Sequence, residues 1–93
     1  MTTHAFVTLT VTEPEQLAAY RDRAAAALEK HGGAVSQASR DLHVLEGKTE
    51  LPHLAAVLTF PDQEAARNWI NDPELTEVHA LRRGSGRSTI ILL

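Results

Sequence analysis

The sequence predicts an α+β domain in which helices cover one face of a four-stranded antiparallel sheet. Four segments have the alternating or densely apolar character of strands, and helix start and stop signals separate them. In addition, the pair Asp72-Pro73 interrupts the last helical segment, because proline cannot continue a helix. We therefore expect the order β-α-β-β-α-(α)-β, with the final cover built from two short helices.

The first strand is expected over residues 4–11, where valine and leucine alternate with phenylalanine and threonine. A helix follows. Thr12 can cap it, Glu15 stands three residues later as in a capping box, and Pro14 suits the first turn. Gly32 ends the helix as a left-handed cap. The apolar stripe of this helix is Leu17, Tyr20, Ala24, Leu28 and His31.

The second strand is expected over Ala34–Glu46. Its first half is polar, which is typical of an edge strand, and its second half alternates from Leu42 onward. In that half His43 lies in mid-strand among apolar neighbours. After a turn at residues 47–51, the segment Leu54–Phe60 is apolar on both faces, which predicts a central strand covered on both sides.

The second helix is expected to begin after a cap at Asp62, and its inner face is Ala65, Ala66, Trp69 and Ile70. A short helix from Pro73 to about Arg82 follows the break. It places Leu75, Val78, His79 and Arg82 on one side. A turn at residues 84–86 leads to the last strand, residues 87–93.

This order of elements is the ferredoxin-like pattern, and residues 1–93 are expected to form one such domain. Helices cover only one face of a ferredoxin-like sheet. Several strands are nevertheless apolar on both faces, so a monomer would expose a large apolar surface. We therefore expect a homodimer in which two sheets stack, a dimeric α/β barrel.

Composition excludes several classes of protein. The net charge is −3, and the only basic cluster, Arg82, Arg83 and Arg87, is short and interrupted by glycines, so no nucleic-acid partner is expected. The absence of cysteine excludes disulfides and thiolate metal sites. The chain shows neither a signal peptide nor a long apolar segment, so a cytoplasmic protein that does not bind membranes is expected.

Several motifs together resemble the DUF1330 family, small dimeric α+β-barrel proteins without an assigned general function. The matching residues are Tyr20, Lys30-His31-Gly32-Gly33, Leu45-Glu46-Gly47, Phe60-Pro61, Ala65-Ala66-Arg67, Trp69, Asp72-Pro73-Glu74 and Ala80-Leu81-Arg82. In the family pattern Glu46 and Arg82 form a possible charged pair, either a salt bridge or a polar wall for an anionic or carbonyl-bearing substrate. The chain departs from the pattern at Thr59, Ile70 and Leu75, where an acidic residue, an aromatic residue and a tyrosine are usual. These departures leave room for a specialised activity.

The candidate catalytic residues are His43, His79 and Tyr20. A positioned imidazole has a pKa near neutrality and can move protons, whereas the alternative is a pair of hydrogen-bonded or half-exposed histidines. We expect a mostly apolar cavity lined by Tyr20, His43, Trp69 and His79, with Arg82 near its mouth. One neutral histidine would accept a proton, and Tyr20 or the second histidine would orient a carbonyl oxygen. The expected substrate-binding residues are Trp69, Arg82 and Glu46, although Tyr20 and Trp69 could also be plain core.

Two functional hypotheses follow. In the first, the protein is an enzyme without cofactor or metal that acts by proton transfer on an apolar carbonyl-containing metabolite, as an isomerase, cyclase or quinol-type monooxygenase. In the second, it is a non-catalytic dimeric module that binds a small ligand or a partner protein. A pocket holding His43 or His79 beside an aromatic wall would favour the first. A filled core with both histidines solvated would favour the second.

Overall fold

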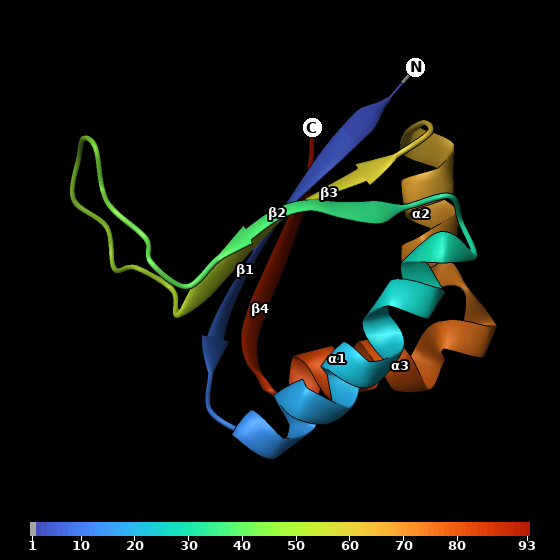
Figure 1. The fold of residues 1–93 in the computed structure, drawn as a ribbon, viewed down its shortest axis with the longest axis horizontal. Helices are drawn as coiled ribbons and strands as arrows, with labels where there is room; N and C mark the ends of the chain where they lie inside the picture. The colour runs from blue at the N-terminus through green and yellow to red at the C-terminus, as the bar shows by residue number, and fades with distance from the viewer. Residues whose placement is uncertain (1) are drawn as a thin grey trace.

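The computed structural model describes residues 2–93 and confirms the predicted ferredoxin-like fold. Its elements are β1 (Thr3–Val11), α1 (Pro14–Glu29), β2 (Ala34–Ser39), β3 (Leu54–Phe60), α2 (Gln63–Asn71), the 3₁₀ turn η1 (Pro73–Leu75), α3 (Thr76–Gly84) and β4 (Gly86–Leu92). The strands form one antiparallel sheet in the order β2-β3-β1-β4. Figure 1 shows the three helices on one side of this sheet. None of the helices within residues 2–93 combines the length and the apolar character needed to cross a membrane.

The register of the strands separates a helix-facing layer from an outer layer. Ala5 of β1 pairs with Leu58 of β3 and with Leu92 of β4, and side chains of this layer lie under the helices. On the opposite face, Phe6 is 40% exposed and Ile91 is 53% exposed. The sheet therefore has one face in the core and one partly apolar face in solvent, as the alternation of β1 predicts.

The predicted cap of α1 is wrong. The helix includes Pro14 in its first turn as expected, but its cap position is Glu13 and no side chain caps it. Instead, the backbone N–H groups of Thr12 and Glu13 donate to the carbonyl oxygen of Ser85, at 2.8 and 3.0 Å. Because Ser85 lies between α3 and β4, a tertiary contact rather than a local capping box holds the chain where α1 begins.

The second strand is shorter than predicted. β2 ends at Ser39, and residues 40–53 form an irregular loop that extends away from the helices (Figure 1). Ser39 closes a local turn by accepting a hydrogen bond from the Asp41 N–H at 3.0 Å. The segment that would have to pair with residues 40–46 is also engaged elsewhere, because the N–H of His53 donates to Leu9 and Pro52 has no N–H. The alternating segment at residues 42–47 therefore has no partner strand.

The interruption at Asp72-Pro73 is confirmed. Asp62 caps α2 by accepting from the Ala65 N–H, and Asp72 caps η1 by accepting from the Glu74 N–H, both at 2.8 Å. The second carboxylate oxygen of Asp72 lies 2.7 Å from Lys30 Nζ and 2.8 Å from His31 Nε2. These hydrogen bonds hold the pKa of Asp72 well below its usual value and tie the end of α1 to the break. All four residues that were predicted to lie on one side of the short helix after the break are buried: Leu75, Val78, His79 and Arg82.

Candidate functional site

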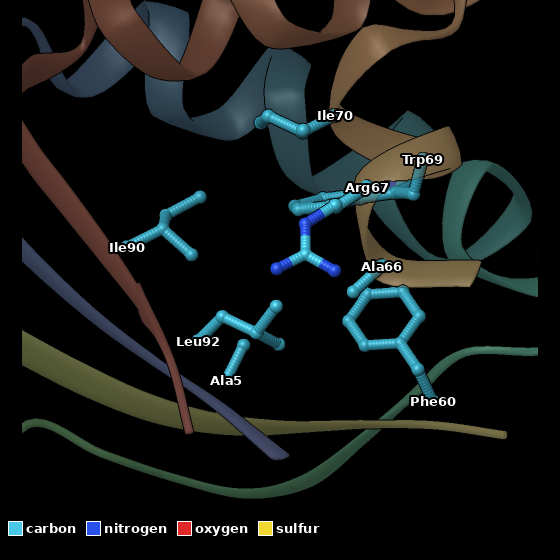
Figure 2. Close-up of a pocket in the computed structure, with 8 residues that line it drawn as sticks. All are labelled: Ala5, Phe60, Ala66, Arg67, Trp69, Ile70, Ile90 and Leu92. Carbon is cyan, nitrogen blue, oxygen red and sulfur yellow. The ribbon is translucent and has the colours of Figure 1, made fainter. Parts of the chain in front are cut away.

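An apolar cavity of about 290 Å³ lies between α2 and the helix-facing side of β1 and β4 (Figure 2). Its lining residues are Ala5, Phe60, Ala66, Arg67, Trp69, Ile70, Ile90 and Leu92. Alternation along β4 directs Ile90 and Leu92 to the helix side, and the small side chains of Ala5 and Ala66 leave the space open. Ligand pockets are typically mostly apolar with a few placed polar groups, and this cavity is of that kind.

Two aromatic rings form one wall of the cavity. The rings of Phe60 and Trp69 have their centroids 5.5 Å apart at an angle of 47°, and both side chains are almost fully buried. Phe60 ends β3 and Trp69 occupies the inner face of α2, so strand and helix both position this wall. A flat apolar molecule would find complementary surface here.

Arg67 is the one charged residue among the eight that line the cavity. It is exposed at its position on α2, and Figure 2 shows its side chain reaching in among the other lining residues. Its Nη1 donates to the Gln63 side-chain oxygen at 3.4 Å, one helical turn away. In the part of the chain that the structure describes, no carboxylate lies within 4.0 Å of this guanidinium. Its charge is therefore available to a ligand.

Behind the Trp69 wall lies a cluster of three buried residues, Trp69, His79 and Arg82, and the half-buried Tyr20, called the Arg82 cluster below. The Arg82 guanidinium carbon lies 5.8 Å from the centre of the Tyr20 ring and 5.6 Å from that of Trp69, within cation–π range. The His79 ring meets the Trp69 ring edge-on, with centroids 4.8 Å apart. The helices α1, α2 and α3 therefore pack against one another through this one set of side chains.

The hydrogen bonds of the Arg82 cluster define the tautomer of His79. Arg82 Nη1 lies 2.7 Å from His79 Nδ1, and since arginine has only donors, Nδ1 must accept. The hydrogen of the imidazole is then on Nε2, which donates to the Trp69 carbonyl oxygen at 2.9 Å. Burial and, to a smaller extent, the positive charges of Arg82 and Arg83 lower the pKa of His79. His79 is therefore neutral, and neither ring nitrogen is free for a substrate.

Two buried donors of this cluster have no acceptor. The indole Nε1–H of Trp69 and the Nε–H of Arg82 are buried and lack a hydrogen-bond partner within residues 2–93. Most buried polar groups in proteins are hydrogen-bonded, so two orphaned donors on adjacent side chains require an explanation.

The expected cavity of Tyr20, His43, Trp69 and His79 does not form within this chain. The structure brings Tyr20, Trp69, His79 and Arg82 together, but only Trp69 among them also lines the apolar cavity. His43 lies in the loop 40–53, exposed, with its Nε2 3.1 Å from a carboxylate oxygen of Asp41. The two histidines are separated because the strand expected to carry His43 ends at Ser39.

The expected pair of Glu46 and Arg82 is also wrong. Glu46 is exposed in the same loop, whereas Arg82 is only 3% exposed and its side chain packs between α3, α1 and α2. Arg82 consequently does not stand at the mouth of the cavity. That position belongs to Arg67.

Sequence reasoning missed Arg67 and the β4 residues as lining residues. Arg67 follows buried Ala66 and precedes Trp69 by two positions, so a helical wheel places it at the border of the inner face. This border position is the sequence feature from which the place of Arg67 in the cavity lining could have been predicted. Within residues 2–93, no set of three or more side chains of metal-ligating type is placed to hold a metal ion.

Comparison with known proteins gives a family and a fold. A family model described as a domain of unknown function, DUF1330, matches residues 2–93. RPA0582 of Rhodopseudomonas palustris, a protein of unknown function, is similar with a TM-score of 0.74 at 21% identity, covering 99% of this chain and 80% of that one. No curated protein matches the chain.

Two further solved structures share the fold at 16% identity. One is a dimeric ferredoxin-like protein of unknown function from Jannaschia sp. CCS1, with a TM-score of 0.67 and coverage of 100% of this chain and 98% of that one. The other is SnoaB, a cofactor-independent oxygenase from Streptomyces nogalater, with a TM-score of 0.62 and coverage of 99% and 88%. At these identities the likeness establishes the fold alone.

Proposed function

The chain belongs to the DUF1330 family, and we propose that it is a homodimeric protein that binds and processes an apolar carbonyl-containing metabolite in the cavity beneath α2. The observation that carries this proposal is an apolar cavity of about 290 Å³ that has an aromatic wall and a single unpaired cation. The volume suits a molecule of two or three fused rings. Arg67 would contact its oxygen, because a guanidinium is a strong donor to carbonyl and anionic oxygens.

The proposed chemistry is proton transfer without an organic cofactor. When a substrate loses a proton next to its carbonyl group, negative charge develops on the oxygen, and a nearby cation stabilises that charge. Arg67 supplies such a cation. Of the eight lining side chains none is a carboxylate or an imidazole, so the proton would leave to water. Tyr20, His79 and Arg82 would act as positioning residues that hold Trp69 in place.

Among isomerase, cyclase and quinol-type monooxygenase chemistry, the last has the most support. SnoaB, which shares the fold, is described as a cofactor-independent oxygenase, and this support is fold-level analogy. An oxygenase without a cofactor requires a substrate that itself gives electrons to oxygen, and a readily deprotonated aromatic ketone does so. An apolar cavity with one cation is suited to such an anion.

A non-catalytic ligand-binding module is the second candidate. It is favoured by the absence of a proton acceptor among the lining side chains and by the engagement of both His79 nitrogens. Both candidates share the same cavity, so one binding experiment tests the site and one turnover experiment separates them.

The proposed homodimer uses the outer face of the sheet. Phe6 and Ile91 are exposed there, and related structures are described as dimeric ferredoxin-like proteins. The loop 40–53 presents Leu45, which is 99% exposed, and a partner subunit would shelter it.

Binding can be followed through Trp69, because it is the only tryptophan in the chain. We expect 1,4-naphthoquinone, a flat dicarbonyl compound, to quench its fluorescence in a saturable way. Replacing Ile90 with Phe should fill the cavity and abolish saturation, whereas Ala18→Phe on the exposed side of α1 should leave it intact. Quenching that never saturates, or that survives Ile90→Phe in a folded protein, would contradict the site.

Turnover can be tested with anthrone, in which a ring carbonyl faces an acidic methylene group. Oxygenation converts the methylene to a second carbonyl, with one atom of O₂ entering the product and the other leaving as water, so no external reductant is needed. We expect the protein to accelerate oxygen uptake, and Arg67→Gln to lower the rate about tenfold or more. Saturable binding without acceleration would favour the non-catalytic module.

A further inference from the structure

We propose that the cavity holds its ligand as an oxygen anion, and that Arg82 behind the Trp69 wall and Arg67 at the cavity create this preference. The inference rests on the proposed function and deepens it, because it names the charge state of the bound molecule. Carboxylates, enolates and phenolates of aromatic ring systems form the chemical class.

The first observation is that Arg82 is a buried cation without a counter-charge. It is 3% exposed, and within residues 2–93 no carboxylate lies within 4.0 Å of its guanidinium. Its contacts are a neutral imidazole and the faces of two aromatic rings. The carboxylate of Asp72 is engaged by Lys30 and His31. A buried charge without a partner is costly, so an anion in the adjoining cavity would offset a cost that the protein already bears.

The second observation is the pair of orphaned donors. Trp69 Nε1–H and Arg82 Nε–H are both buried in the cluster and lack an acceptor within the described residues. Both nitrogens are shielded from the cavity, so a ligand would not bond to them directly, but Trp69 itself lines the cavity. The uncompensated positive ends of these donors therefore favour a negative charge on the other side of the Trp69 wall.

The third observation is that Arg67 adds a second guanidinium for which the described residues supply no carboxylate partner. Arg82 packs on the indole that forms the wall, and Arg67 is itself a lining residue (Figure 2). None of the eight lining residues is acidic. Two cations beside an apolar space raise the electrostatic potential in it, whereas a neutral ligand would gain little from this arrangement.

The experiment compares two ligands of the same shape, 2-naphthoate and the uncharged 2-naphthamide, by isothermal titration calorimetry at neutral pH. We expect the carboxylate to bind about tenfold tighter or more, the size of a charge-assisted hydrogen bond. Arg82→Met, which retains an apolar side chain of similar length, should remove most of this preference, measured as the ratio of the two affinities within the variant. Arg67→Gln, at an exposed position, should reduce it. The matched control is Arg21→Gln, an exposed arginine on α1 that does not line the cavity, which should leave the preference unchanged.

Four outcomes would overturn the inference. Equal affinities for the two ligands would show that the cavity does not distinguish charge, while leaving the proposed function intact. A preference that survives both Arg67→Gln and Arg82→Met would assign it to other residues. If Arg82→Met fails to fold, a preference that is unchanged in Arg67→Gln decides against the proposal. If neither ligand binds, the cavity is not a ligand site and the proposed function fails with the inference.

Discussion

At the scale of single residues, Trp69 connects the two features that matter for function. The residue is 2% exposed, and its indole forms part of a wall of the cavity. The same indole also contacts the Arg82 guanidinium and the His79 ring. A change in the Arg82 cluster would therefore be transmitted to the cavity through a single side chain. Most buried aromatic residues are only core, and this one is core and wall together.

His79 makes the stability of the fold depend on pH. Because its pKa is lowered on folding, the unfolded chain binds a proton more readily, so this contribution is complete above the ordinary value of 6.5 and is lost as the pH falls below it. We expect the melting temperature to fall on acidification from neutral pH toward the acid side of 6.5. In His79→Gln, which keeps an amide donor and an acceptor, the fall should be smaller. Melting curves of both proteins across this range check the prediction, and parallel pH profiles would contradict it.

At the scale of elements, the connection from α1 to β2 fits closely against the sheet. Gly32 has φ +70°, the left-handed conformation predicted for the helix cap. At Gly33 a β-carbon would stand 2.7 Å from a ring carbon of Phe60 and 3.3 Å from a methyl group of Leu28. Since Phe60 is a buried wall of the cavity, the connection and the site share one packing constraint.

Two glycine substitutions test this constraint. Gly33→Ala should lower the free energy of unfolding by about 1–3 kcal/mol, because the Phe60 ring cannot move away without strain. Gly84→Ala is the matched control, since its new β-carbon would meet only the exposed, flexible side chain of Gln16, and we expect a change within about 0.5 kcal/mol. Urea unfolding followed by circular dichroism measures both. Equal effects of the two substitutions would show that the packing around Phe60 is looser than the structure indicates.

At the scale of the whole molecule, the outer face of the sheet and the loop 40–53 remain without cover. Val57 pairs with Phe6 in the β1–β3 register and lies on the same outer face, whereas Val7 faces the helices. The residue that contacts a partner subunit is therefore Val57 rather than Val7. In the proposed homodimer this face is the centre of the interface.

Sedimentation at micromolar concentration should give twice the chain mass of 10.2 kDa. Val57→Asp should shift the protein toward monomer or unfold it, because an unpaired charge buried in the interface costs several kcal/mol. Val35→Asp is the control: this side chain is 52% exposed on the edge strand β2 and pairs with Leu58 in the helix-facing layer. A wild-type monomer, or a Val57→Asp protein that stays dimeric, would refute the assembly.

Local patterns in the sequence determined most of the fold. The alternation of β1, the cap at Asp62, the interruption at Asp72-Pro73 and the buried stripe of α3 all depend on residues a few positions apart. The side chains of the Arg82 cluster could be placed on inner faces for the same reason. Periods of 2 and 3.6 residues record which side of an element is buried, and they are visible without tertiary information.

The tertiary structure decided where β2 ends, what holds the start of α1 and which residues enclose the cavity. Alternation after Ser39 predicts a strand, but a strand also needs a free partner, and residues 52–53 offer none to it. For this reason His43 and Glu46 lie outside the site. Arg67 lines the cavity because α2 lies over β1 and β4, and this placement depends on segments that are far apart in the chain. Such relations depend on packing between elements, whereas the sequence pattern within each element records only its own buried side.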